Sequence, residues 1–350
     1  QPLNRMFTHL HVHSHYSLLD GLAKVDELLN KTKEQGLKSL ALTDHGTMYG
    51  TIEFYQKAKE IGVKPIIGVE AYIARNGRKQ KRPRIDASPY HIVLLAKNEA
   101  GYRNLLKLTT KASLEGFYYK PRVDLELLEK YNEGIIALSA CLQGEVSVAA
   151  LSDKPDQAKE AVTRYKKIFG EENFYLEVQD HPNIAKQKTA NDFIAEIAQK
   201  TNTPLVATND VHYLNTEDDK VHDVLMCIQT QRTVTDENRL SMVGTDFSLR
   251  DPQDMIDSCK DYPEATANTV KIAEQCNLEI KLGGSKLPLY PVPKEKTTDN
   301  YLRELCTKGL DKRYQIKDPG EIISDKEKEI IERLDYELSV ISKTNFSSYF

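Results

Sequence analysis

The sequence predicts an α/β protein in which helices cover a parallel β-sheet. Short runs rich in β-branched and other apolar residues alternate with segments whose apolar residues follow helical spacing. This alternation is typical of a parallel sheet with helices outside it. Glycines also end several of the helical segments, where a left-handed backbone costs glycine little. The predicted strands are 7–13, 39–43, 65–74, 92–96, 135–140, 174–178 and 205–208.

Helices are predicted at 25–35, within 48–61 and at 157–169, and each ends at a glycine. A stretch rich in proline and glycine, 283–293, then separates the alternating region from two helix-like runs. These runs are 299–313 and 325–342. We therefore expect two domains, residues 1–284 and 285–350.

The composition indicates a compact globular chain, with 40% hydrophobic and 29% charged residues. The 48 basic and 52 acidic side chains give a net charge of −4, so any contact with nucleic acid must be regional. The longest apolar runs are far shorter than the ~20 residues of a membrane helix, and no secretory signal opens the chain. Five widely spaced cysteines without a CxxC pair favour a reducing cytoplasm over a disulfide framework.

Four histidines alternate along the first predicted strand: His9, His11, His13 and His15. Alternate side chains of a strand share one face, so the four imidazoles would project together. Metal ligation accounts for such a group, because neutral imidazoles can share a cation. A remnant of a purification tag or a polar edge strand is the alternative.

Further residues of metal-ligand type recur beside strand ends. They are Asp20, Asp44, His45, Glu70, Cys141, Asp210 and His212. Functional groups of parallel α/β barrels gather at the carboxyl ends of the strands, so these side chains are expected at one rim. His91 precedes the run 92–96 and fits only if that strand begins earlier or the barrel is distorted.

At these residues the sequence resembles the polymerase and histidinol phosphatase (PHP) domain. The resemblance rests on His11-Val12-His13-Ser14, Asp20-Gly21, Thr43-Asp44-His45-Gly46, Gly68-Val69-Glu70, His91, Leu138–Leu142 and Asn209-Asp210-Val211-His212. Segments 16–21, 119–122 and 137–144 are more narrowly similar to the version at the amino terminus of bacterial DNA polymerase III alpha subunits. The resemblance covers about residues 5–280. It implies a distorted (β/α)7 barrel, the PHP fold, followed by a small, mainly helical carboxyl-terminal segment.

The resemblance further implies nine metal ligands, and none is missing from the sequence. They are His11, His13, Asp20, His45, Glu70, His91, Cys141, Asp210 and His212. Nine exceed what one ion takes, which implies a cluster. The implied groups are His11, His13, Glu70 and Asp210 around one metal, Glu70, His91 and Cys141 around a second, and Asp20, His45 and His212 around a third. The mixed ligands suit Zn²⁺, with Mn²⁺ or Fe²⁺ as alternatives.

Such a cluster suits phosphoester hydrolysis without a protein nucleophile. We expect a 3′–5′ exonuclease module that acts on the 3′ end of single-stranded DNA, with its proton donor unassigned. A non-catalytic docking module braced by metals and a free-standing small-molecule phosphatase are the alternatives. The remaining histidines His181 and His222 are interpreted as packing or surface residues.

Basic residues between Glu70 and His91 are candidates for contacts with a DNA backbone. They are Arg75, Arg78, Lys79, Lys81, Arg82 and Arg84, and a second group, Lys120 and Arg122, follows Tyr118-Tyr119. A solvated loop and a packed tyrosine pair are the alternatives.

Segments 287–293, 301–306 and 335–338 resemble the start of the polymerase palm of the same alpha subunits. The sequence stops before that family's catalytic aspartates, so no nucleotidyl transfer is expected. The resemblance implies the rest of the polymerase chain as a partner, with a separate proofreading subunit and other replication proteins as further candidates. No membrane partner is expected.

Overall fold

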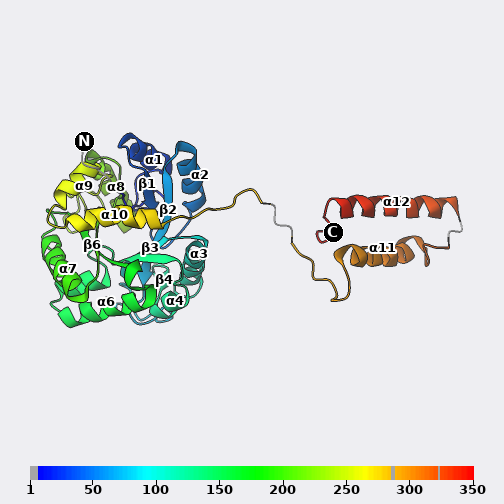
Figure 1. Ribbon diagram of the computed structural model, residues 1–350, viewed down its shortest axis with the longest axis horizontal. Coiled ribbons are helices and arrows are strands. Elements are labelled where there is room, and N and C mark those ends of the chain that lie inside the picture. Colours follow the sequence, from blue (N-terminus) through cyan, green and yellow to red (C-terminus); the bar gives the residue numbers. More distant parts are fainter. Residues whose placement is uncertain (1–6, 285–287, 322–323) are drawn as a thin grey trace. The chain divides into compact units, whose positions relative to one another are not determined.

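The computed structural model describes residues 7–284, 288–321 and 324–350. The chain forms two compact units, one that ends at Ile280 and one that runs from Lys281 to Phe350. The predicted domain boundary, between 284 and 285, adjoins residues 285–287, which lie outside the described residues. The first unit is a curled mixed sheet surrounded by helices, and the second is helical (Figure 1).

The first unit alternates strands and helices along most of its length. Its strands are β1 (Ser39–Leu42), β2 (Lys64–Ile73), β3 (Tyr90–Ala96), β4 (Arg122–Val123), β5 (Ile135–Leu138), β6 (Phe174–Gln179) and β7 (Leu205–Thr208). Its α-helices are α1 (Val25–Glu34), α2 (Thr51–Ile61), α3 (Glu99–Leu114), α4 (Leu125–Lys130), α5 (Glu145–Leu151), α6 (Pro155–Phe169), α7 (Gln187–Thr201), α8 (Asp219–Thr230), α9 (Pro252–Ser258) and α10 (Pro263–Gln275). The predicted glycine stops after α2 and α6 are confirmed, since Gly62 and Gly170 both have positive φ angles.

The strand order is β1-β2-β3-β5-β6-β7, with β4 paired to β2. The prediction of an all-parallel sheet is wrong at β3, which runs antiparallel to both β2 and β5. The cause is the connection: β2 and β3 are joined by a loop without a helix, and a parallel return requires a crossover. The amino end of β3 therefore lies beside the carboxyl end of β2. This reversal, together with a start at Tyr90, brings His91 to the rim.

Segment 7–13 closes the ring between β1 and the residues after β7. The main-chain amides of Ala41 and Thr43 donate to the carbonyls of His9 and Val12. On the other side Val211 exchanges hydrogen bonds with His11 and His13. Only Val12 forms a β-bridge here, so the predicted strand 7–13 is an extended closing segment rather than a regular strand.

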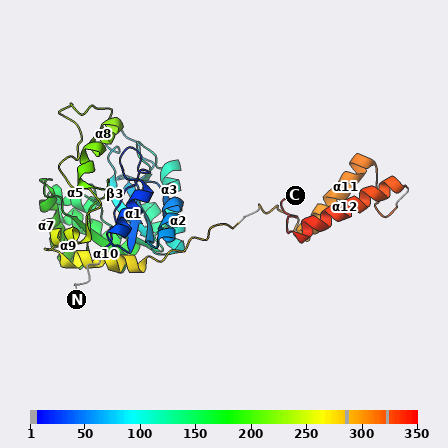
Figure 2. The ribbon, with the colours of Figure 1, turned by 90° about the horizontal axis from the view of Figure 1, so that it is seen from above.

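Helix α10 covers the end of the barrel at which the parallel strands begin. Asn268 donates to the carbonyl of Leu205, the first residue of β7, and Lys64, the first of β2, donates to the carbonyl of Ala273. Ile272 joins the barrel interior, where it is buried with Leu10, Ala41, Ile66, Val93, Leu95, Leu138 and Val206. Figure 2 shows α8 at the opposite end of this unit. The interior is thus packed, and the far rim is left for a site.

The second unit contains α11 (Thr298–Tyr314) and α12 (Asp325–Lys343), close to the predicted runs. Ser324 caps α12 by accepting from the amide of Glu327. Arg303 of α11 and Asp335 of α12 form an ion pair of 2.6 Å. Within the described parts of the chain, no helix has both the length and the apolar character required to cross a membrane.

Candidate metal centre

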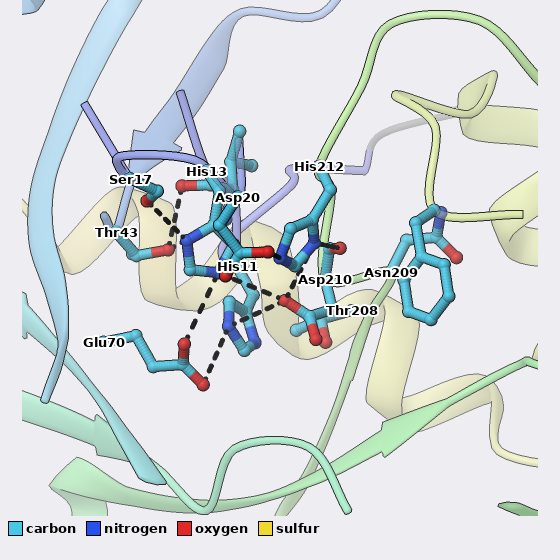
Figure 3. A network of polar contacts seen from close by, with 12 residues as sticks. His11, His13, Ser17, Asp20, Thr43, Glu70, Thr208, Asn209, Asp210 and His212 are labelled. Carbon is cyan, nitrogen blue, oxygen red and sulfur yellow. Dashed lines mark hydrogen bonds and ion pairs between the residues drawn. The ribbon is translucent and has the colours of Figure 1, made fainter. Parts of the chain in front are cut away.

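The nine predicted ligands meet at the rim formed by the carboxyl ends of the parallel strands. A cavity of 570 Å³ opens there, and seven of the nine line it: Asp20, His45, Glu70, His91, Cys141, Asp210 and His212. His11 and His13 are fully buried beneath them. Figure 3 shows His11, His13, Glu70 and Asp210 directed toward one another. Residues scattered over two hundred positions of sequence thus converge in one place.

Glu70 lies at the centre of this arrangement. Its two carboxylate oxygens are 3.4 Å from Nε2 of His11 and 3.5 Å from Nε2 of His13. They also lie 2.6 Å from Nδ1 of His45 and 2.8 Å from Nδ1 of His91. A carboxylate shared by four imidazoles is placed to bridge adjacent cations.

Asp210 faces the same two buried histidines from the opposite side. Its Oδ1 lies 3.1 Å from Nε2 of His11 and 3.2 Å from Nε2 of His13. Asp20 contacts His45, with 2.7 Å between Oδ2 and Nε2, and its Oδ1 is 3.8 Å from Nε2 of His212. Asp20 and Asp210 therefore add two further carboxylates to the histidines around Glu70.

Three groups of side chains have ligand atoms close enough to share an ion, all within 4.8 Å of one another. They are His11, His13 and Glu70; His45, Glu70 and His91; and His13, His45 and His212. His13, His45 and Glu70 each belong to two groups, which is what a polynuclear site requires. Asp20, Cys141 and Asp210 line the cavity but lie outside these three groups, which were found among the described residues.

The donor set fits divalent cations. Buried ligand atoms of the cluster make no hydrogen bond among the described residues: His11 Nε2, His13 Nε2, His45 Nδ1, Glu70 Oε2 and Asp210 Oδ1. They face one another instead, at 2.6 to 3.5 Å. Such a group of buried ligand atoms pays a desolvation cost that bound cations would offset. Imidazole nitrogens with carboxylate oxygens suit Zn²⁺, Mn²⁺ or Fe²⁺.

A second layer orients the two buried histidines. Nδ1 of His11 donates to Oε1 of Glu177 at 2.8 Å, and Nδ1 of His13 donates to Oγ of Ser17 at 3.0 Å. Ser17 in turn donates to Asp44 at 2.8 Å. Because Nδ1 carries the proton in each ring, the lone pair of Nε2 points into the cluster. Glu177 was not among the predicted site residues, and its signal is a carboxylate within a mainly apolar buried strand.

Only two of the four alternating histidines join the cluster. His9 directs Nε2 to the carbonyl of Arg250, and the ring of His15 lies against Tyr16. The expectation that all four project together is wrong, because His9 and His15 have these other contacts instead.

Burial and charge set the pKa values of the cluster. Burial disfavours protonated His45, but Glu70 and Asp20 outweigh it and raise the pKa of His45 to about 10. Burial and the neighbouring His45 and His212 lower the pKa of His13 to about 3. Burial, Asp210 and Glu70 hold the pKa of the Cys141 thiol well above its usual range. The cluster therefore mixes protonated and neutral imidazoles, and cations compete with protons for it.

Backbone strain occurs at three ligand-bearing turns. Asp210 itself has a φ angle of 51°, Ala140 before Cys141 has one of 62°, and Leu19 before Asp20 has one of 61°. Left-handed conformations are unusual for alanine and leucine and are retained where surrounding structure enforces them. The three turns therefore hold their ligands in place at an energetic cost.

Two of the basic residues proposed to contact DNA are buried within the protein. Arg122 is fully buried and donates to the carbonyls of Arg78, Gln80, Asp86 and Gly116. Arg78 is 5% exposed and pairs with Glu115, Asp124 and Glu126. These guanidinium groups organise the loop after β2, and we leave them out of the DNA interface.

The other basic candidates lie on the surface. They are Arg75, Lys79, Lys81, Arg82, Arg84 and Lys120. Arg82 pairs with Asp86, and Arg75 stacks on the ring of Tyr90. Lys120 lines the cavity of the metal ligands and lies 5.3 Å from the ring centre of Tyr72. It is the member of this set placed beside the candidate metal centre.

Comparison with known proteins gives two family matches. Residues 9–181 match the PHP domain, and residues 300–350 match the bacterial DNA polymerase III alpha NTPase domain. DNA polymerase III subunit alpha of Borreliella burgdorferi is 44% identical over 98% of this chain, and that of Treponema pallidum is 42% identical over 98%. The subunit of Aquifex aeolicus is 41% identical over 99%.

The chain spans 29%, 29% and 31% of the lengths of these three relatives, so it corresponds to less than a third of each. Among solved structures, an amidohydrolase from Chromobacterium violaceum is 15% identical, covers 59% of this chain and 87% of its own, and has a TM-score of 0.39. Similarity at this level says nothing about function.

Proposed function

Because this chain carries a PHP domain and corresponds to the amino-terminal region of bacterial DNA polymerase III alpha subunits, we propose that its first unit is a metal-dependent phosphodiesterase. It removes nucleotides from the 3′ end of single-stranded DNA. One observation supports this most: buried imidazole and carboxylate atoms that make no hydrogen bond converge beneath an open cavity of 570 Å³. Such a cavity gives a substrate access to the ligands.

The proposed centre holds three divalent ions, with Zn²⁺ as the first choice and Mn²⁺ or Fe²⁺ as alternatives. His11, His13, Glu70 and Asp210 hold one, Glu70, His91 and Cys141 a second, and Asp20, His45 and His212 a third. The close approach of Glu70 to four imidazoles supports its role as the shared ligand. Such ions supply activated water and neutralise phosphoryl charge.

The chain's own residues orient these ligands and receive the DNA. Glu177 and Ser17 fix the rings of His11 and His13, so that both Nε2 atoms face the cavity floor. Lys120 offers a cation beside the ligands, and the exposed basic residues Lys79, Lys81 and Arg84 extend this charge along the loop after β2. Contacts of this kind bind a phosphate backbone irrespective of base sequence.

A nuclease assay tests the proposal directly. The purified chain, loaded with Mn²⁺ or Zn²⁺, should shorten a 5′-labelled single strand one nucleotide at a time. Asp20→Asn should abolish this activity, because it weakens a ligand that contacts His45. Asp26→Asn is the matched control, since Asp26 lies on α1 in an exposed pair with Lys57. Cleavage that Asp20→Asn leaves intact contradicts the proposal.

A metal-braced module without hydrolysis is the competing function, and the spread of the ligands over the barrel is the observation that favours it. They come from β2, from β3 and from the segments next to β1, β5 and β7, so bound ions would tie the barrel together. Loss of thermal stability on chelation, with no DNA cleavage in any metal, would support this role. Hydrolysis of small phosphomonoesters but not of DNA would instead indicate a small-molecule phosphatase.

We propose that residues 285–350 begin the palm of a replicative polymerase whose remaining chain is the main partner. The cytoplasm is then the proposed location, with other replication proteins, including a separate proofreading subunit, as further partners. An interaction assay between this chain and the rest of a relative's alpha subunit tests the assignment. Failure of the two parts to associate contradicts it.

A further inference from the structure

His181 follows β6 and lines the cavity of the metal ligands, but it belongs to none of the groups that could share an ion there. Its side chain is 1% exposed. Neither ring nitrogen has a hydrogen-bond partner among the described residues. Since one nitrogen of a neutral imidazole always carries a proton, a buried donor here lacks an acceptor. Such a group is unusual in a folded protein and requires an explanation.

The ring is held by packing rather than by polar contacts. It lies against Phe247, with 4.3 Å between the ring centroids, and Phe247 also meets the ring of His212 edge-on at 5.9 Å. His181 and the predicted ligand His212 therefore flank the same phenyl ring. Burial lowers the pKa of His181 to about 4, so the ring is neutral at pH 7. It can donate one hydrogen bond to a ligand in the cavity and accept another.

The surroundings indicate the charge of that ligand. The cavity shared with the metal ligands contains Lys120, whose ammonium favours an anion. Its carboxylates, Asp20, Glu70 and Asp210, are the ones whose charge the proposed cations would neutralise. His181 borders a second cavity of 250 Å³, which is lined by Asp180, Asp192 and Asp261. Those carboxylates disfavour an anion on that side, although Lys188 also lines it. Once cations occupy the metal centre, an acceptor with negative charge is therefore better placed on the metal side.

We propose that His181 donates a hydrogen bond to a phosphoryl oxygen of the substrate bound at the metal centre. This inference rests on the proposed phosphodiesterase function and adds a substrate-contacting residue to it. His181 is not a metal ligand in this account. The unpartnered N–H is the group that the bound phosphate satisfies.

Binding measurements on the Mn²⁺-loaded chain test this without depending on turnover. The probes are inorganic phosphate and dAMP, titrated by calorimetry into the native chain, His181→Phe and His181→Gln. Phenylalanine keeps a ring against Phe247 but removes the donor, and glutamine restores a donor. We expect His181→Phe to lower the affinity for both probes about tenfold or more, because hydrogen bonds to charged groups are strong. His181→Gln should recover part of this loss.

Three controls separate a substrate contact from a structural role. Metal content should be unchanged in His181→Phe, and the unfolding temperature should be equal or higher, since the variant removes an unpartnered polar group from a buried site. Asp261→Asn, in the second cavity, should leave both affinities unchanged. A loss of metal, a lower unfolding temperature with unchanged affinity, or an equal effect of Asp261→Asn would overturn the inference.

Other outcomes are equally decisive. If the native chain binds neither probe, or if only dAMP responds to His181→Phe, a contact with the phosphoryl group is refuted. If phosphate binding depends on His181 but DNA is not cleaved, the inference stands and the proposed nuclease function fails. The two claims are thus tested separately.

Discussion

At the scale of single residues, the buried pair of His11 and Glu177 fixes the geometry of the candidate metal centre. Nδ1 of His11 donates to Glu177, and this leaves Nε2 free to bind a cation. Glu177 also accepts from Gln179 and Thr208, so its own position is fixed. Groups of this kind commonly govern metal affinity almost as strongly as the ligands themselves.

We therefore predict that Glu177→Ala weakens metal binding about 10- to 100-fold while the fold is retained. Competition with a fluorescent chelator measures the affinity, and circular dichroism reports the fold. Glu172→Ala serves as the control, because Glu172 is an exposed carboxylate on the short 3₁₀ turn before β6. Unchanged metal affinity in Glu177→Ala would show that His11 does not need this partner.

Protonation of His45 predicts how metal uptake depends on pH. Its pKa of about 10 exceeds the ordinary value of 6.5, because Glu70 and Asp20 outweigh the cost of burial. The charged ring thus stabilises the metal-free chain below pH 6.5, and this contribution is lost as the pH rises to about 10. A cation needs the same imidazole unprotonated.

Metal uptake at pH 7 should therefore release a proton from His45, and the apparent affinity should rise up to tenfold per pH unit between pH 7 and 10. Calorimetric titrations in two buffers of different ionisation enthalpy count the protons. Equal heats in both buffers would contradict the assignment of His45 as a ligand.

At the scale of secondary-structure elements, the turn that carries Asp20 depends on Gly21. A Cβ atom at Gly21 would lie 2.0 Å from the carbonyl oxygen of Ser14, an overlap that only a backbone shift can relieve. The amide of Ser17 donates to that same carbonyl. A glycine is thus required for this turn to fold back beside the histidines.

Gly21→Ala should displace Asp20 and remove at least one bound ion per chain, which elemental analysis can measure. Gly309→Ala in α11 is the control, because nothing lies within 4 Å of the added methyl group. Full metal content in Gly21→Ala would mean that the turn tolerates the shift.

The loop between β2 and β3 is organised by Arg122 of β4, whose guanidinium donates to carbonyls of that loop and of Gly116. Arg122→Met should lower the free energy of unfolding by about 3 kcal/mol or more, because buried carbonyls lose their donor. Lys81→Met, at an exposed position of the same loop, should stay within about 0.5 kcal/mol. Denaturant titrations measure both, and equal stability of the two variants would refute this role.

Much of the element order could be predicted from sequence, because the apolar runs and glycine stops are local signals. The mainly apolar, continuously buried runs of β2 and β6 and the glycine after α2 illustrate this. The direction of β3 could not be predicted. The loop before it has no helical spacing, and the path of this loop decides whether β3 runs parallel or antiparallel to β2. The two-residue strand β4 has too little sequence to give a period at all.

At the scale of the whole molecule, segments distant in sequence build one site. The ligand types could be predicted from their places beside strand ends, and the PHP resemblance selected the nine. Which of them share an ion could not be predicted, because His13 and His45 join groups that depend on side-chain packing. The burial of Arg78 and Arg122 could not be predicted either, because a basic run has the same composition whether it faces solvent or carbonyl oxygens.

Chelation should destabilise the first unit and leave the second unchanged, because the candidate ligands all belong to residues before Ile280. Each ion held at a thousandfold its Kd contributes about 4 kcal/mol to folding. Differential scanning calorimetry with and without EDTA measures the shift in unfolding temperature. This shift should be smaller in His13→Ala than in the native chain. An unfolding transition that EDTA does not move would mean that the cluster binds no metal tightly.

Nine side chains gathered at one rim are proposed to hold several divalent ions, and their number can be counted. Elemental analysis of the chain after loading with Zn²⁺ and desalting gives this count, with Asp20→Asn measured in parallel. We expect more than one tightly bound ion per chain, three at full occupancy, and fewer in the variant. One ion or none in the native chain would contradict it.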